Sequence, residues 1–347
     1  METSEKTSID SDVSKEKLVK AVKEVHKTSK DSSKVVTDTE EKIYNLGFMP
    51  LNEVAGLVLD ELEETYDLDR TKKLWLPRSQ KAAELMNSGM QLLDDEKMRN
   101  IVIDIDSKYS KKIEEIANKL KQYPFWQANK YSIKMVRIDE LICLQSFVNL
   151  DRANYQKRKI TKETMMEDLL DFCFPFNREQ SEIHSHMISN NAALFSTNDH
   201  DVRPGKIEIR KVPKFWDDGI DKVLALVIPV VEGDPFVYCV RTYGPFQMPD
   251  QTTKKIYFLT LQNGIHRAYA LKSLGIEYMP CLIIDPSTAA EAQMVSKNWN
   301  PERALQNVSQ RPPLMKDFFN PDLTEKFKVR KRLMCIRVEW KIEPFTT

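Results

Sequence analysis

The chain has 347 residues, of which 41% are apolar and 30% carry a charge, and its 52 basic residues balance its 52 acidic residues. This length accommodates a substantial hydrophobic core in two or three modest domains. Zero net charge removes the general electrostatic argument for nucleic-acid binding and leaves only a local basic patch to consider. No apolar run reaches the roughly 20 residues that a membrane helix needs, so no membrane partner is expected.

The five cysteines, Cys143, Cys173, Cys239, Cys281 and Cys335, stand singly within apolar stretches, and no CxxC motif occurs. Their number is odd, and none has a histidine beside it in the sequence. This pattern predicts buried, reduced thiols, as in a cytoplasmic protein, rather than a disulfide framework.

The chain begins with residues 1–38, which are dominated by Ser, Thr, Lys, Asp and Glu, and this composition predicts a disordered tail. Residues 39–128 then show helical spacing of their apolar positions, and Pro77 suits the first turn of a helix. The expected helices cover residues 54–66, 78–93 and 107–123. We therefore expect a small helical subdomain over 39–128.

Residues 151–170 are expected to be helical and are basic at their start, where Lys157, Arg158 and Lys159 follow one another. Such a run either tracks the phosphates of a nucleic acid or forms a solvated helix face. The end of the chain offers a second basic segment, with Lys331 and Arg332 in a stretch whose alternation predicts an edge strand.

Residues 171–204 are polar and are expected to be irregular, with a flexible lid among them. They hold His184, His186 and His200. A His-x-His pair on a strand presents both rings on one side, as a metal site requires. The spacing matches no metal-binding motif, so no metal site is predicted, and polar loop residues are the alternative reading.

Residues 205–242 predict a β-rich segment, including a buried central strand over 223–231 and a return strand over 236–241. The strands 223–231 and 236–241, joined by a turn over 232–235, are expected to form a hairpin that lies beside the strand 255–261. Asn263 and Gly264 then form a turn dipeptide, since both tolerate positive φ.

The helix that follows this turn is expected over residues 265–274, with Gly275 just past its end, and a second apolar strand covers 279–284. His266 and Arg267 fall in the first turn of the helix, where backbone N–H groups lack helical partners and the dipole is positive. An anion site, of the kind that binds phosphate, is one interpretation. The other is a solvated arginine beside a structural histidine.

The residues Gly264-x-His266-Arg267-x-x-Ala270, followed by a strand led by Pro280, resemble the signature box of the ParB/sulfiredoxin superfamily. In that superfamily the box lies at a strand–turn–helix junction and binds nucleotide phosphates. Its members include partition proteins that bind and hydrolyse CTP, ATP-dependent sulfinic-acid reductases and small-molecule kinases. The resemblance implies an α+β fold with a mixed sheet and helices, preceded here by the helical subdomain.

A second segment, residues 133–152, resembles the opening strand and loop of the same fold. The matching positions are Ile138, Asp139, Glu140, Leu141, Gln145 and Asn149. The gap between the two boxes is longer than in compact members of the superfamily. The resemblance therefore implies a ParB/sulfiredoxin-like domain over 129–298 with an insertion around 151–204, and a C-terminal extension, 299–347, packed on it.

Two positions depart from the family pattern. Ile265 stands where the reductases have the cysteine that precedes their His-Arg pair, which argues against reductase chemistry. Asn263 stands where an aspartate is frequent, which removes a possible carboxylate.

The resemblance implies a nucleotide-binding protein, leaning to kinase-like or NTPase activity, in which His266 and Arg267 hold the phosphates of ATP or CTP. Asn263, Gly264 and Ile265 would complete the nucleotide-binding turn. Phosphoryl transfer also calls for a carboxylate that positions Mg²⁺ or takes a proton, and the candidates are Glu140 and Asp139.

Two alternatives stay open. One is a nucleic-acid-binding regulator of the partition or defence kind, contacting DNA through Lys157, Arg158, Lys159, Lys331 and Arg332. The other is a non-catalytic interaction protein that keeps the fold without the ligand.

Overall fold

The structure is a computed structural model, and it describes residues 39–60, 62, 67–87, 93–176, 184–189, 192–197, 202–204, 208–212, 223–227, 230–232, 235–247, 251–296, 311–330 and 334–339. The predicted tail 1–38, His200 and the basic pair Lys331 and Arg332 lie outside these residues. Among the described residues, no helix is long and apolar enough to cross a membrane.

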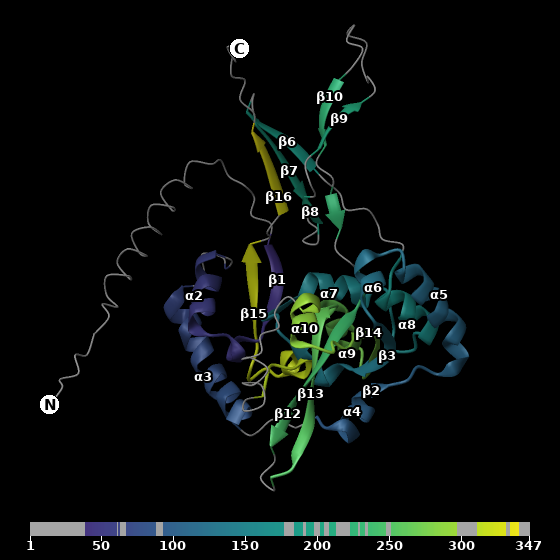
Figure 1. Ribbon diagram of the computed structural model, residues 1–347. Helices are drawn as coiled ribbons and strands as arrows, with labels where there is room; N and C mark the ends of the chain where they lie inside the picture. Colours follow the sequence, from purple (N-terminus) through teal and green to yellow (C-terminus); the bar gives the residue numbers. More distant parts are fainter. Residues whose placement is uncertain are drawn as a thin grey trace, which may run out of the picture. The chain divides into compact units, whose positions relative to one another are not determined.

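The fold class is α+β, with helices and mixed sheets. The main sheet has six strands in the order β2-β3-β14-β12-β13-β4. Its strands are β2 (Val102–Ile103), β3 (Tyr131–Arg137), β4 (Ile142–Cys143), β12 (Tyr238–Gln247), β13 (Thr253–Asn263) and β14 (Tyr278–Ile284). β12 and β13 form a long antiparallel hairpin (Figure 1). The hairpin was expected instead between the strands 223–231 and 236–241, and this was wrong, because β12 pairs with β13 and β14 and β10 pairs with β9. β14 runs parallel to β12 and antiparallel to β3. The two strands that flank the turn at Gly264 and the helix after it, β13 and β14, therefore both lie inside the sheet and not at its edges.

The first described part of the chain contains a strand and a series of helices. In order these are β1 (Thr39–Tyr44), η1 (Leu46–Phe48), α2 (Leu51–Asp60), α3 (Leu68–Asn87), α4 (Asp95–Ile101), η2 (Ser107–Tyr109), α5 (Ser110–Leu120) and α6 (Pro124–Ala128). The expectation that Pro77 starts a helix was wrong, because Pro77 lies inside α3. Asp67 marks the true start, where its side chain accepts a hydrogen bond of 2.6 Å from the Arg70 amide.

The segment 39–128 does not form one helical unit. β1 is a strand in a three-stranded sheet, β15-β1-β5, with β5 (Phe147–Asn149) and β15 (Glu325–Arg330). Side chains of α2 pack with β1 and β15 in one hydrophobic cluster. Side chains of α4, α5 and α6 instead belong to the core of the main sheet. Strand pairing with a distant part of the sequence overrides the local pattern here.

The remaining helices are α7 (Leu150–Lys157), α8 (Met166–Cys173), α9 (Ile265–Ser273) and α10 (Ala289–Val295), and the first three carry residues of the site described below. Two short 3₁₀ helices, η3 (Ile138–Glu140) and η4 (Met315–Phe319), lie against each other. The segment before η4 joins the sheet edge, where Leu314 bridges to Ile142 and the Cys143 amide donates to the Pro313 carbonyl at 3.0 Å.

Residues 171–204, which were expected to be irregular, contain the strands β6 (His184–Ser189), β7 (Ala192–Thr197) and β8 (Val202–Pro204). The segment 205–242, which was predicted to be β-rich, contains β9 (Glu208–Val212), β10 (Val223–Val227), β11 (Val230–Glu232) and the start of β12. β6 and β7 form a sheet with β16 (Met334–Glu339), and the other strands, apart from β12, pair two by two. β10 was predicted to be a central strand, but in the described residues it pairs with β9 alone. In the described residues β10 therefore pairs with the strand that precedes it in the sequence and not with a strand of the main sheet.

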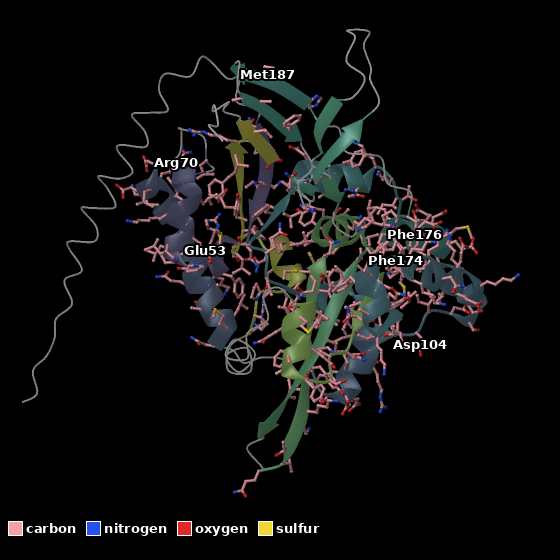
Figure 2. All side chains as sticks on the ribbon, turned by 45° about the horizontal axis from the view of Figure 1, so that its top comes forward. Glu53, Arg70, Asp104, Phe174, Phe176 and Met187 are labelled. Atoms are coloured by element: carbon pink, nitrogen blue, oxygen red, sulfur yellow. The ribbon has the colours of Figure 1, made fainter. Side chains whose placement is uncertain are left out.

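An aromatic cluster fixes the start of β12. Phe236 is buried, and its ring centroid lies 4.9 Å from that of Tyr123 and 5.0 Å from that of Phe176. Phe174 and Phe176 lie where side chains crowd together at the end of α8 (Figure 2). Rings packed edge-to-face and tilted in this way hold a segment more firmly than burial alone. The backbone at residues 235–237 is thereby fixed in front of the turn at Gly264.

Candidate functional site

The turn between β13 and α9 requires glycine at position 264. Gly264 has φ 104° and ψ 16°, the left-handed region that L side chains rarely adopt. A Cβ atom there would also lie 2.8 Å from Cγ2 of Val237. The Gly264 carbonyl accepts the first hydrogen bond of α9, from the Ala268 amide at 2.9 Å. The predicted turn is thus present, and both backbone conformation and lack of space select glycine.

Two side chains of the box tie this turn to the start of β12. The Asn263 side-chain amide donates to the Phe236 carbonyl at 3.0 Å, and the Arg267 guanidinium donates to the Pro235 carbonyl at 2.5 Å. Ile265 is buried in the main core. Asn263, Gly264 and Ile265 therefore build the turn, whereas Arg267 extends beyond it.

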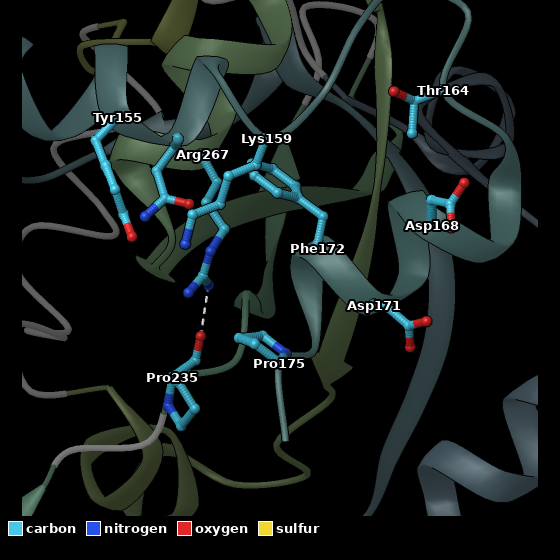
Figure 3. A pocket seen from close by; sticks show the side chains of 10 residues that line it. Tyr155, Lys159, Thr164, Asp168, Asp171, Phe172, Pro175, Pro235 and Arg267 are labelled. Atoms are coloured by element: carbon cyan, nitrogen blue, oxygen red, sulfur yellow. Dashed lines mark hydrogen bonds between the residues drawn. The ribbon is translucent and has the colours of Figure 1, made fainter. Parts of the chain in front are cut away.

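Arg267 lines a cavity of about 590 Å³. The wall is formed by residues of α7, α8 and the segments that follow them, together with Pro235 (Figure 3). Its lining residues are Tyr155, Gln156, Lys159, Thr164, Asp168, Asp171, Phe172, Pro175, Pro235 and Arg267. This volume falls within the range of small-molecule sites, about 300–1,000 Å³.

The charges of the cavity are divided between its walls. Lys159 and Arg267 lie together on the side of α7 and α9, whereas Asp168 and Asp171 lie on α8 beyond Phe172, with their carboxylates directed away from the two cations (Figure 3). Asp171 forms an ion pair with Lys112 of α5 at 2.7 Å, and this hydrogen-bonded contact raises the pKa of Lys112. The basic side of the cavity suits an anionic group, and the acidic side suits a cation or a hydrogen-bond donor.

His266 does not line this cavity. It is half-buried, and its Nε2 atom is shielded from solvent. Successive residues of an α-helix point about 100° apart, because one turn takes 3.6 residues. The sequence predicted that His266 and Arg267 hold the same phosphates. In the structure, only Arg267 of these two lines the cavity.

The two predicted catalytic carboxylates lie on η3 and form ion pairs away from the cavity. Asp139 forms an ion pair with Lys272, and Glu140 forms one with Lys316 of η4 at 3.1 Å. Lys272 follows Arg267 by five residues, which is about 7.5 Å along the helix. Asp139 and Glu140 are not among the residues that line the cavity. The carboxylates that line the cavity are instead Asp168 and Asp171.

The loop residues that resemble the superfamily hold the start of α7. Asn149 caps this helix, since its side chain accepts a hydrogen bond of 3.0 Å from the Arg152 amide. Its amide nitrogen donates to Oε2 of Glu40 in β1 at 2.7 Å, and both residues are buried. These bonds position α7, which carries Tyr155, Gln156 and, just past its end, Lys159.

Of the basic run considered for DNA, Lys157 ends α7 and Arg158 and Lys159 follow it, both exposed. Lys159 differs from Arg158 because it lines the cavity. His184 is exposed and lies on β6 with His186. In the described part of the chain, no group of three His, Cys, Asp or Glu side chains is placed to hold a metal ion.

The cysteines of the core are free thiols. Cys143, Cys173, Cys239 and Cys281 are buried. Burial raises the pKa of Cys173 to about 12, and it raises the pKa of Cys143 and of Cys281 well above the usual range. A thiol that stays protonated at neutral pH is a poor nucleophile, so Cys143, Cys173 and Cys281 are structural.

Comparisons with protein-family models, with curated proteins and with solved structures find no match to this chain. Sequence reasoning missed Tyr155, Gln156, Asp168 and Asp171. No motif singles them out, and the only signal is that Asp168 and Asp171 are three residues apart, which places them on one face of a helix.

Proposed function

We propose that the protein binds a nucleoside triphosphate, ATP or CTP, and that Arg267 and Lys159 hold its phosphates. The observation that carries this proposal is that Arg267 extends from a glycine turn into a cavity that a second cation, Lys159, also lines. The unit of strand, glycine turn, helix and strand resembles the ParB/sulfiredoxin superfamily, and this resemblance supports the same reading. The fold would then be of the ParB/sulfiredoxin type.

The electrostatics of the cavity favour a polyanion. A cation in the first turn of a helix is mildly unfavourable, because the helix dipole is positive there. An anion between Arg267 and Lys159 would remove that penalty and gain charge-assisted hydrogen bonds. The guanidinium has five donors, and it would keep its bond to the Pro235 carbonyl while offering others to phosphate.

The reaction that suits this arrangement is phosphoryl transfer or hydrolysis of the triphosphate. In such reactions the protein contributes mainly positioning and charge stabilisation. Mg²⁺ takes oxygen ligands and is commonly bound by one or two carboxylates together with substrate phosphates. Asp168 and Asp171 are the carboxylates of the cavity, and Asp171 is already paired with Lys112. Asp168 is therefore the carboxylate that we assign to the cation, in place of Asp139 and Glu140.

A thermal-shift screen with ATP, CTP, GTP and ADP, each with Mg²⁺, tests this proposal. A ligand that binds the folded state raises its apparent stability, by about 2.7 kcal/mol at a hundred times its dissociation constant. We expect a shift with a nucleoside triphosphate that disappears in Arg267→Ala. No shift with any nucleotide for the wild-type chain, or an equal shift in the variant, would contradict the proposal.

A further inference from the structure

The cavity contains an exposed aromatic ring beside its cations. Tyr155 lines the cavity and is 46% exposed, and none of the hydrophobic clusters of the described residues includes it. It lies on α7 one turn before Lys159, a spacing at which two side chains meet on the helix surface. Figure 3 shows Tyr155 on the same side of the cavity as Lys159 and Arg267. An aromatic face is thus presented next to the proposed phosphate site.

We infer, resting on the proposed nucleotide binding, that the base of the nucleotide stacks on the ring of Tyr155. Aromatic side chains bind bases by stacking in many nucleic-acid-binding proteins, and the contact tolerates any base because each has a π-face. Lys159 follows Tyr155 by four residues and lies just past the end of α7. A ligand that spans these residues places its phosphates at Lys159 and Arg267 and its base at Tyr155.

Lys159 links the two parts of the site. Its Nζ atom lies 4.3 Å from the centroid of the Tyr155 ring. A hydrogen bond from an ammonium to phosphate is stronger than a cation–π contact at an exposed site. Bound phosphates therefore draw the ammonium away from the ring, and the base takes the face over which Lys159 lies.

Tyr243 is a matched control for this argument. It is 52% exposed, and Nζ of Lys255 lies 3.7 Å from its ring centroid, so it repeats the lysine–tyrosine contact. It lies on β12 and is not among the residues that line the cavity. Any effect seen for Tyr155 and not for Tyr243 comes from the cavity and not from the exposed ring itself.

Titration calorimetry with two probes separates this inference from the proposal on which it rests. The probes are ATP with Mg²⁺ and inorganic tripolyphosphate with Mg²⁺, which lacks a base. We expect Tyr155→Ala to weaken ATP binding roughly tenfold or more and to leave tripolyphosphate binding unchanged. Tyr155→Phe and Tyr243→Ala should bind both probes like the wild type.

Three outcomes would overturn the inference. If Tyr155→Ala binds ATP as tightly as the wild type, the base does not stack there, while the phosphate site stands. If Tyr155→Ala loses both probes equally, the residue supports the cavity without contacting the base. If the wild-type chain binds neither probe, the proposed function fails, and the inference fails with it.

Discussion

The two ends of α9 carry the same kinds of charge but use them differently. At the first turn, Arg267 lies in a cavity with a second cation, Lys159. At the last turn, Lys272 pairs with Asp139, and Glu140 of the same short helix η3 pairs with Lys316. One end presents cations to a cavity, whereas the other end pairs each of its charges with a neighbour.

This difference shows why charge alone does not identify a site. Ion pairs near a protein surface contribute about 0–1 kcal/mol and use the charges that a ligand would need. A hydrogen bond to a neutral carbonyl, such as the one from Arg267 to Pro235, does not cancel the positive charge of the guanidinium. The cavity side of α9 is therefore the end on which an anionic ligand would bind.

The largest expected effect comes from breaking the turn that aims Arg267. Gly264→Ala should destabilise the fold by about 2–4 kcal/mol, because the left-handed conformation disfavours a Cβ and Val237 leaves no space for it. Urea denaturation measures this loss. Gly244→Ala is the control, since a Cβ there meets nothing within 4 Å. Equal unfolding midpoints for the two variants would show that the turn does not need glycine.

A smaller effect is expected from the thiol behind the turn. The Cys173 carbonyl accepts a hydrogen bond from the Val237 amide at 3.0 Å, and burial raises the pKa of its thiol to about 12. The unfolded thiol ionises at its ordinary, lower pKa, whereas the folded thiol stays protonated. The stability contribution is therefore complete below pH 9 and is lost as the pH rises from about 9 towards 12.

Urea denaturation of the wild type and of Cys173→Ala at a series of alkaline pH values checks this prediction. Both chains lose stability through their other buried thiols, and the wild type should lose more than the variant. The same pH dependence in the two chains would mean that the Cys173 thiol is not shielded in the folded state.

The smallest effect is expected at the other end of α9. Asp139→Asn and Glu140→Gln each remove one partner of an ion pair near the surface, so stability should fall by less than about 1 kcal/mol. Nucleotide affinity should not change, because neither side chain lines the cavity. Titration calorimetry with ATP and Mg²⁺ measures this affinity. A tenfold loss in either variant would show that the carboxylate contributes to nucleotide binding.

The sequence predicted the local unit of the site well. The strand β13, the turn at Gly264, the helix α9 and the end of that helix at Gly275, which has φ 78°, all follow from patterns within thirty residues. Turn residues and hydrophobic spacing act over such short distances, so they can be read from the chain directly.

The parts that the sequence did not predict depend on contacts between distant segments. β1 is a strand because it pairs with β15 near the other end of the chain. Tyr155 and Asp168 line the cavity because α7 and α8 lie beside the turn at Gly264, which a helical pattern alone does not reveal. His266 and Arg267 are adjacent in sequence, yet the helix directs them apart.

The most direct test of the central claim is titration calorimetry of ATP with Mg²⁺ against two double variants. Arg267→Gln with Lys159→Ala removes both cations from the cavity and leaves an amide to donate to the Pro235 carbonyl. Lys157→Ala with Arg158→Ala removes the same charge from neighbouring positions outside the cavity lining. We predict that the first variant loses nucleotide binding and the second keeps it. Equal affinity in both folded variants would contradict the account.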